Sequence, residues 1–334
     1  MCFSCFMCWR GLRVDNRNHK GLHYFAVVLA LSTFFLLIVG ALVTSNDAGL
    51  SVPDWPLSHG QFMPEMVGGV FYEHGHRIVA TMVGLLTIIL NIWLWRAQPH
   101  LWVRYLGLVA LVTVVTQGAL GGITVLYLLP APISVLHASM AALFFCFTVV
   151  LAFVTSPSWV DSCQTLISRN WQGVAPGNFE LKLVLYNILA VYGQYILGAT
   201  VRHTGTIGGT KGAALVTSTL VFHIIGAVLL TSLIFYVSKA LLRRVKDKRV
   251  AQLIYTQGGL LSIQLLLGLG AYWVRVDAIN QVQPTEERVL IATAHLAVGA
   301  LLLAVSLMVG LRMTQILESK HQDVLLDSSL AGKI

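Results

Sequence analysis

The chain has 334 residues, of which 56% are hydrophobic and only 11% carry a charge. Soluble domains carry about 25% charged residues, so this deficit along the whole chain excludes an ordinary soluble protein. The formal net charge of +8 would suggest nucleic acid in a soluble protein. Here the basic residues fall between apolar runs, which indicates membrane orientation, and we expect no nucleic-acid partner.

Eight apolar runs follow one another, and each is long enough to cross about 30 Å of hydrocarbon at about 1.5 Å per helical residue. We therefore expect an all-α integral membrane protein with eight transmembrane helices. The first run is too long for a signal-peptide core, and no small-residue cleavage site follows it. The predicted spans are Tyr24–Val43, His76–Trp95, Leu106–Leu126, Ile133–Val154, Leu183–Val201, Ala213–Tyr236, Leu253–Val274 and Val289–Leu311.

The N-terminus carries a C-x2-C-x2-C run of Cys2, Cys5 and Cys8. An iron–sulfur or zinc site needs a fourth thiolate or a nearby imidazole. No fourth cysteine lies close, although His19 and His23 follow, so we expect an inert or lipidated tail rather than a metal site. Cys146 lies inside a predicted span and is expected to pack as a small apolar residue.

Lysine and arginine set the expected orientation, because they concentrate in the cytoplasmic segments of membrane proteins. With the N-terminus inside, most of the 22 lysines and arginines fall in inner segments. We therefore predict that both termini face the cytoplasm, most simply across a bacterial inner or plasma membrane. The residues left on the outer side are Arg77, Arg202, Lys211, Arg275 and Arg288.

Four short matches recur in the same order in the two halves of the chain. Each half has an even number of spans, so we predict two parallel repeats, each a four-helix bundle. The alternative is convergence of generic helices rich in glycine and alanine. The matches pair Gly40–Val43 with Gly198–Val201, His76 with His223, Gln117 and Gly121 with Gln264 and Gly268, and His137 with His295.

Four of the eleven histidines share one depth, in the outer third to half of the even-numbered spans: His76, His137, His223 and His295. An ionisable residue inside a span is costly and indicates a function. Imidazoles from facing helices can hold haem iron from both sides. We therefore predict that these four residues are the axial ligands of two haem irons, one in each half. A proton relay or another metal would need more intramembrane carboxylates.

Several glycines on the odd-numbered spans would let a flat macrocycle or a neighbouring helix approach closely. Most of the other histidines are expected at the surface, and His74 points away from His76 around the helix. The glycines are Gly118, Gly121, Gly122, Gly268 and Gly270.

The neighbours of the two predicted sites differ. Glu73 lies one turn before His76 on the same helix face, whereas Leu220 holds the equivalent place before His223. Arg77 is similarly matched by Ile224. We expect Glu73 to be a general acid or base, with a helix N-terminal acid as the alternative role. Arg77 has two candidate partners, Glu73 and a haem propionate.

The segments before the two histidines also differ in length. About thirty residues separate the first two spans, against about a dozen between the fifth and sixth spans. A long outer segment favours a lid or gate over the first site. We therefore expect the first site to be reactive and the second to be a low-spin electron carrier.

These features divide the chain into five segments. The expected order is a cytoplasmic N-terminal tail (1–23), an N-terminal half with the reactive haem site (24–155), a cytoplasmic linker (156–182), a C-terminal half with the electron-carrying haem site (183–312) and a cytoplasmic C-terminal tail (313–334).

The chain resembles the haem A synthase family from Tyr24 to about Leu311. The resemblance is carried by Gly40–Leu57 (GALVTSNDAGLSVPDWPL), Glu73–Arg77 (EHGHR) and the later histidines with the small residues that follow them. Members oxidise a methyl group of haem O to the formyl group of haem A, which terminal oxidases use. The resemblance therefore implies an oxidoreductase of haem biosynthesis and cytochrome oxidase assembly.

The resemblance also implies roles for individual residues: His76 and His137 bind the substrate haem, Glu73 is needed for catalysis, and His223 and His295 hold haem b. It further implies that a haem O synthase delivers haem O and that the protein contacts membrane lipid. The electron acceptor is not named by the sequence, and a homo-oligomer stays open. Many members carry a cysteine pair in the first outer loop. Here Ser58 precedes His59-Gly60 and no predicted outer segment has a cysteine, which excludes an outer redox disulfide.

Two other functions compete with this one. A di-haem b-type cytochrome would move electrons between quinones or across the membrane, but such proteins usually place their ligands at two depths. A haem transporter or chaperone would need alternating access and would have no need for Glu73.

Overall fold

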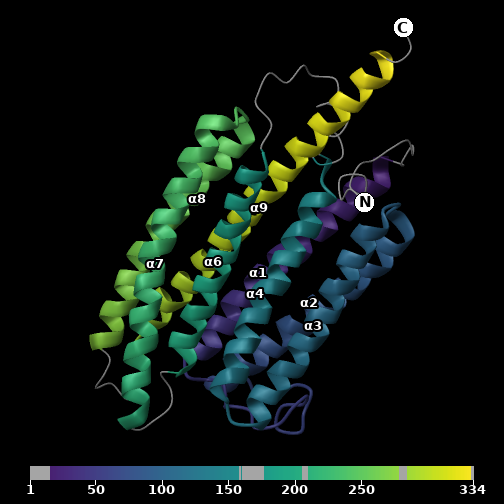
Figure 1. Ribbon diagram of the computed structural model, residues 1–334. Coiled ribbons are helices and arrows are strands. Elements are labelled where there is room, and N and C mark those ends of the chain that lie inside the picture. Colours follow the sequence, from purple (N-terminus) through teal and green to yellow (C-terminus); the bar gives the residue numbers. More distant parts are fainter. Residues whose placement is uncertain (1–15, 158, 160–176, 205–209, 278–283, 332–334) are drawn as a thin grey trace.

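The computed structural model describes residues 16–157, 159, 177–204, 210–277 and 284–331, and almost all of the described chain is helical (Figure 1). Apolar runs rich in leucine, valine and alanine form these helices because each backbone polar group is satisfied within its own segment. The helices are α1 (Asn16–Ser45), α2 (Gly69–Ala97), α3 (Leu101–Leu126), α4 (Ala131–Val154), α6 (Asn178–Thr204), α7 (Thr210–Arg244), α8 (Lys248–Asp277) and α9 (Glu286–Ala331).

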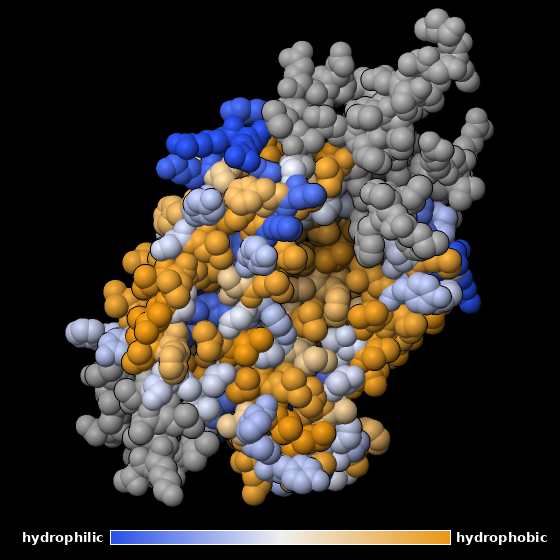
Figure 2. All heavy atoms as spheres, viewed as in Figure 1, coloured by the Kyte–Doolittle hydropathy of each residue, from blue (hydrophilic) through white to orange (hydrophobic). Residues whose placement is uncertain are grey.

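Within the described ranges, eight helices are long and apolar enough to cross a membrane, as predicted. Many large apolar side chains on them are exposed, which lipid rather than water would accommodate. Figure 2 shows apolar side chains over most of the visible face, with hydrophilic ones gathered at the turn between α7 and α8. The protein is therefore a multi-pass membrane protein.

The helices form two rings of four that lie side by side (Figure 1). In the first ring α1 contacts α2, α2 contacts α3, α3 contacts α4 and α4 contacts α1. In the second ring α6, α7, α8 and α9 contact one another in the same cyclic order. The seam between the rings is formed by α1 with α9, α4 with α6, and α4 with α9.

Small buried side chains line part of this seam. Ala300 and Ala304 of α9 pack with Leu37 of α1 and Phe145 of α4 in one apolar cluster. Small residues allow helix backbones to approach closely, which is how membrane helices gain packing energy without help from water. The seam therefore fixes the two rings against each other near the middle of the bundle.

The four histidine-bearing helices, α2, α4, α7 and α9, all begin at the same end of the bundle, where residues 46–68 connect α1 to α2 (Figure 1). We call this the loop end and the other the opposite end. Helix α1 begins and α9 finishes at the opposite end (Figure 1). The eight described helices alternate in direction, so the start of the first and the finish of the last lie at the same end.

Some helices extend beyond the predicted spans. Helix α6 begins at Asn178, inside the expected linker, because Glu180 accepts the Gly177 N–H at 2.9 Å and pairs with Arg244. Helix α9 continues to Ala331, through most of the expected C-terminal tail, and α1 begins at Asn16. Hydropathy marks only the part of a helix that lies in lipid, whereas polar residues continue the same helix outside it.

The cysteine predictions have different outcomes. Cys2, Cys5, Cys8 and also Cys163 lie outside the described residues. Cys146 is a free, half-buried thiol of α4 that packs beside an apolar cluster containing Ala142 and Leu303, as expected.

Candidate haem-binding site

Each of the four predicted histidines packs its imidazole against a glycine of the preceding helix. A Cβ atom placed on any of these glycines would lie only 3.0–3.2 Å from the histidine Cε1, closer than side chains normally approach. Glycine is therefore what leaves room for each ring. The pairs are Gly40 with His76, Gly121 with His137, Gly198 with His223, and Gly268 with His295.

A glutamine lies one turn before three of these glycines and reaches the same histidine. Gln117 Nε2 donates to the His137 carbonyl at 2.9 Å. Gln194 Nε2 donates to the His223 carbonyl at 2.8 Å and lies 3.0 Å from His223 Nδ1, and Gln264 Nε2 lies 3.4 Å from His295 Nε2. In α1 the equivalent position holds Leu36, so among the described contacts of these four histidines a glutamine is missing at His76.

The histidines meet in two pairs, one in each ring. The imidazole centroids of His223 and His295 are 6.4 Å apart with the rings 80° from parallel. His76 and His137 interact electrostatically with each other. Metal–imidazole bonds are about 2 Å long, so two imidazoles on opposite sides of one metal ion have centroids roughly 6 Å apart. The spacing in the second ring therefore suits a shared iron.

Haem fits the rest of the chemistry at these pairs. Nδ1 of His76, His137 and His295 is buried and has no hydrogen-bond partner within the described chain. Buried polar atoms without partners are rare and need an explanation such as an ion. The described residues contain no group of three or more histidine, cysteine, aspartate or glutamate side chains that could hold a metal ion. Two imidazoles per site suit a macrocycle that supplies the remaining ligands.

Glu73 and Arg77 link the first pair to the segment 46–68, which we call the outer loop. The Glu73 side chain is buried, and its Oε1 accepts from Arg77 Nη2 at 2.8 Å. Its Oε2 accepts the Val52 N–H of the outer loop at 2.9 Å. Of the two candidate partners of Arg77, the structure therefore shows Glu73.

Arg77 also holds the outer loop directly. Its guanidinium donates to the carbonyls of Asp54 at 2.8 Å, Leu57 at 2.7 Å and Val52 at 3.4 Å, and to Ser58 Oγ at 3.2 Å. Arginine suits this role because its five N–H donors form a rigid planar fork. The arginine therefore ties the loop to the helix that carries His76.

Two further contacts fasten the outer loop over the first ring. The buried Ser58 hydroxyl lies 2.7 Å from Nδ1 of His74, which is itself buried on α2. The indole of Trp55 packs on Gly122, where a Cβ would lie 2.7 Å from the ring. Gly122 directly follows Gly121, which contacts His137. The loop therefore covers the bundle end beside the first histidine pair.

Asp54 organises the tip of the loop. Its carboxylate accepts the N–H groups of His59 at 2.7 Å and Gly60 at 2.8 Å, while the exposed His59 has a positive φ of 52°. The pKa of Asp54 lies below its ordinary value of 3.8, mainly because its carboxylate accepts the Gly60 N–H. Burial acts in the opposite direction, and the His59 N–H lowers the pKa further.

The second pair has no comparable clamp among the described residues. Leu220 and Ile224, which correspond to Glu73 and Arg77, are aliphatic, and Ile224 is largely exposed. The connection between α6 and α7 is short, and residues 205–209 lie outside the described chain. A half-buried cation is nevertheless near, because Arg202 interacts electrostatically with His295 and donates to the Ala41 carbonyl of α1 at 2.9 Å.

The structure brings together residues that the sequence singled out: the rings of His223 and His295 are in contact, His137 is near enough to His76 to act on it electrostatically, and Glu73 and Arg77 lie beside His76. Sequence reasoning missed Gln194, although its spacing before Gly198 repeats that of Gln117 and Gln264. It also missed the bond between Ser58 and His74. No local pattern could have revealed that contact, since it joins a loop to a helix.

Fold and site together define a polytopic membrane protein with two paired-histidine sites in matching rings, one of them covered by a clamped loop. Residues 1–149 match the family described as "Cytochrome oxidase assembly protein". A protein named "Heme A synthase" from Symbiobacterium thermophilum is 34% identical over 209 residues, which cover 61% of this chain and 67% of that protein.

Proteins of the same name from Shouchella clausii and Geobacillus kaustophilus are 31% and 30% identical over 58% and 55% of this chain. The matched part spans 63% and 57% of those two relatives, which is less than two thirds of their length. The chain belongs to the haem A synthase family of cytochrome oxidase assembly proteins.

Proposed function

We propose that this protein is a haem A synthase, which oxidises a methyl group of haem O to the formyl group of haem A. Family membership supports this activity, and so do the spacing of His223 and His295 and the unpartnered ring nitrogens of His76, His137 and His295, which fit haem. The observation that carries the proposal is the difference between the pairs. Only the first has a carboxylate and a clamped loop beside it among the described residues.

We assign the substrate haem to His76 and His137 and a resident haem b to His223 and His295. A covered site suits the reaction because exclusion of water protects reactive species. His76 also lacks the glutamine that supports each of the other three histidines. A less supported ligand suits a haem that must enter and leave, whereas Gln194 and Gln264 suit one that stays.

Glu73 is the proposed proton acceptor at the first site. Oxidation of a methyl group removes protons together with electrons. A bound haem would supply the redox-active iron, and the protein would supply a proton acceptor. The Glu73 carboxylate lies one turn from His76, but both of its oxygens already accept hydrogen bonds. The Val52 N–H is the partner that moves with the outer loop. Displacement of this loop would free Oε2 to take a proton, so loop position and proton transfer would be coupled.

The proposed topology places both termini in the cytoplasm, with the loop end outside. Helix α1 begins and α9 finishes at the opposite end, where the basic α7–α8 turn also lies. The matching order of contacts in the two rings supports an internal repeat of two parallel four-helix bundles. The seam has the same symmetry, because α1 with α9 corresponds to α6 with α4.

The partners follow from this activity. The protein would receive haem O from a haem O synthase in the same bacterial cell membrane and pass haem A to terminal oxidase assembly. Both are apolar macrocycles, so transfer within the bilayer avoids water.

Extraction of haems from the purified protein tests the function. We expect haem b together with haem O, haem A or a hydroxylated intermediate when a haem O source is co-expressed, identified by chromatography and mass. Haem b alone under those conditions would favour a di-haem electron-transfer cytochrome and overturn the proposal.

A further inference from the structure

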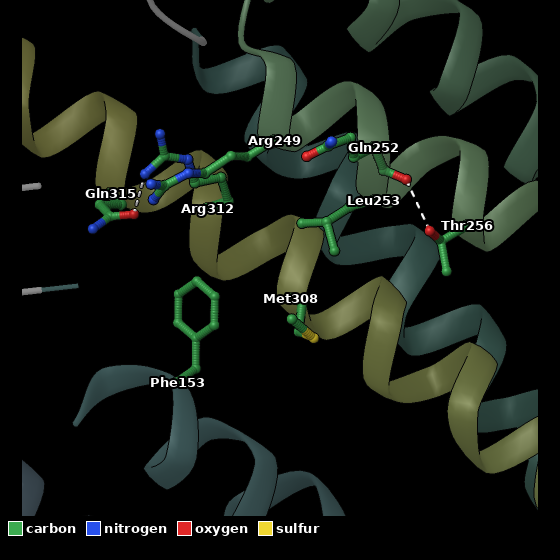
Figure 3. Close-up of a pocket in the computed structure, with 8 residues that line it drawn as sticks. All are labelled: Phe153, Arg249, Gln252, Leu253, Thr256, Met308, Arg312 and Gln315. Atoms are coloured by element: carbon green, nitrogen blue, oxygen red, sulfur yellow. Dashed lines mark hydrogen bonds between the residues drawn. The ribbon is translucent and has the colours of Figure 1, made fainter. Parts of the chain in front are cut away.

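A cavity of about 270 Å³ opens at the opposite end of the bundle, away from the histidines (Figure 3). Arg312 in its wall and His295 are both on α9, about 25 Å apart at about 1.5 Å per residue. The cavity is therefore separate from both proposed haem sites. Its lining comes from α4, α8 and α9: Phe153, Arg249, Gln252, Leu253, Thr256, Met308, Arg312 and Gln315.

The inner wall of the cavity is polar, and hydrogen bonds hold its side chains in place. Arg312 is buried at 6% exposure, and its guanidinium donates to Asp247 Oδ2 at 2.9 Å and to Gln315 Oε1 at 2.6 Å. A longer contact of 3.5 Å joins its Nε to Asp247 Oδ1. Gln315, also buried, donates in turn to the Trp159 carbonyl at 3.3 Å. These bonds hold the Arg312 guanidinium in place and use three of its five N–H donors.

The charges that the described residues bring to the cavity do not cancel. Asp247 neutralises one guanidinium, and it is the only carboxylate that pairs with Arg312 in the described chain. Arg249 lies at the rim, and none of the ion pairs found among the described residues includes it. Figure 3 shows both arginine side chains extending toward the side of the cavity where Gln315 lies. Two guanidinium groups and one carboxylate leave a positive surplus, which favours an anion.

The other part of the lining is apolar. Leu253 of α8 and Met308 of α9 are half-buried and lie one turn nearer the middle of their helices than Arg249 and Arg312. The half-buried Phe153 joins them from the end of α4. Free phosphate has no apolar surface to bury against these side chains, whereas the acyl chains of a lipid do. The cavity therefore combines an anion site with an apolar wall, at the depth where a helix leaves the hydrocarbon.

We propose that this cavity binds the phosphate group of an anionic phospholipid, with Arg249 and Arg312 as its cationic partners. The acyl chains run along Phe153, Leu253 and Met308 toward the bilayer centre. Basic pockets between transmembrane helices bind anionic head groups in this way. Because Phe153 belongs to the first ring and the arginines to the second, the bound lipid joins the rings across their seam and stabilises the pair.

Native mass spectrometry of the full chain, purified in detergent and stripped of lipid, tests the proposal. Phosphatidylglycerol should bind the unmodified protein at least several-fold more tightly than phosphatidylcholine. Arg249→Gln should weaken phosphatidylglycerol binding by about five- to tenfold, because it removes one cation near the head group. Arg243→Gln removes the same charge from the end of α7, outside the cavity lining, and should leave this binding unchanged.

Arg249 is the better test residue, because Arg312→Gln would leave the Asp247 carboxylate unpaired and could prevent folding. Equal binding of the two lipids, or equal loss in the Arg243 and Arg249 variants, would overturn the proposal. Competition with inorganic phosphate is the third measurement. If inorganic phosphate displaces phosphatidylglycerol at a comparable concentration, the site recognises phosphate alone, and the lipid proposal is wrong.

Discussion

At the scale of single residues, the four glycines beside the histidines show the most regular close contact in the structure. Each leaves a space that the imidazole ring fills, and the same contact recurs once in each helix pair. The recurrence matters because a chance contact would not repeat at equivalent places of two rings. Glycine is otherwise a weak helix former, so each of these positions costs helix stability for the sake of the histidine.

Gly198→Ala should disturb the proposed haem b site. The added Cβ would lie 3.2 Å from Cε1 of His223, so the ring must shift by a few tenths of an ångström or turn. We expect a changed low-spin absorption spectrum and reduced haem b content in the purified protein. Gly193→Ala is the matched control on the same helix, since nothing lies within 4 Å of its added Cβ. An unchanged spectrum in both variants would mean that the Gly198 contact does not position the ligand.

Glu73→Gln should retain haem b but lose most conversion of haem O, on the order of a hundredfold, as is common when a general acid or base is removed. The amide oxygen can still accept the Val52 N–H, so the loop keeps that bond while the proton acceptor is lost. Activity and extracted haems report the result, and haem O or a partly oxidised haem should accumulate. Leu220→Gln, at the equivalent place of the second ring, should affect turnover much less. Normal turnover of Glu73→Gln would make Glu73 only a loop anchor.

At the scale of elements, the outer loop is held to α2 mainly by one side chain, Arg77. Three backbone carbonyls and one hydroxyl of the loop accept from Arg77, and Glu73 accepts from both Arg77 and the loop. The loop is thus attached to the helix that carries His76.

Arg77→Gln should loosen the outer loop, because a neutral amide cannot reach four loop acceptors and leaves the Glu73 carboxylate unpaired. We expect proteolysis within residues 46–68 to become at least about tenfold faster, as local opening costs less free energy. Arg288→Gln removes a charge at the start of α9 and serves as control. Equal cleavage rates for the Arg77 variant and the unmodified protein would contradict the role of this clamp.

The loop tip should also respond to acid through Asp54. Its folded pKa lies below the ordinary value of 3.8, so its stabilising effect is complete above that pH and is lost as pH falls through the folded pKa. Hydrogen exchange of the His59 and Gly60 amides should therefore show constant protection from pH 7 to about pH 5, and extra loss of protection below about pH 4. Asp54→Asn should remove that acid-dependent step. A step that persists in this variant would belong to another group.

At the scale of the whole molecule, the four histidines can act on one side of the membrane only if the helices alternate as proposed. Reporter fusions after Trp95 and after Lys248 should read cytoplasmic, and fusions near Asp54 and Gln281 should read external, because most basic residues flank the first two points. A single reversed fusion would break the argument that both haem sites lie near the outer face.

Much of this architecture could be predicted from sequence because lipid imposes a one-dimensional constraint. A run of about twenty apolar residues must form a helix, so hydropathy alone located all eight spans. Alternation of direction then placed at one end the starts of α2, α4, α7 and α9, the helices that carry the four histidines. The helix periodicity put Glu73 on the face of His76 before any tertiary contact was known.

Only the tertiary structure decided which groups those residues meet. Arg77 contacts Glu73 and the outer loop because the chain folds residues 46–68 back over α2. Ser58 with His74 and Trp55 on Gly122 arise in the same way. The cavity at Arg249 and Arg312 needs α4, α8 and α9 to meet. Sequence determines a helix through local patterns, but contacts between distant segments depend on packing, which no local pattern records.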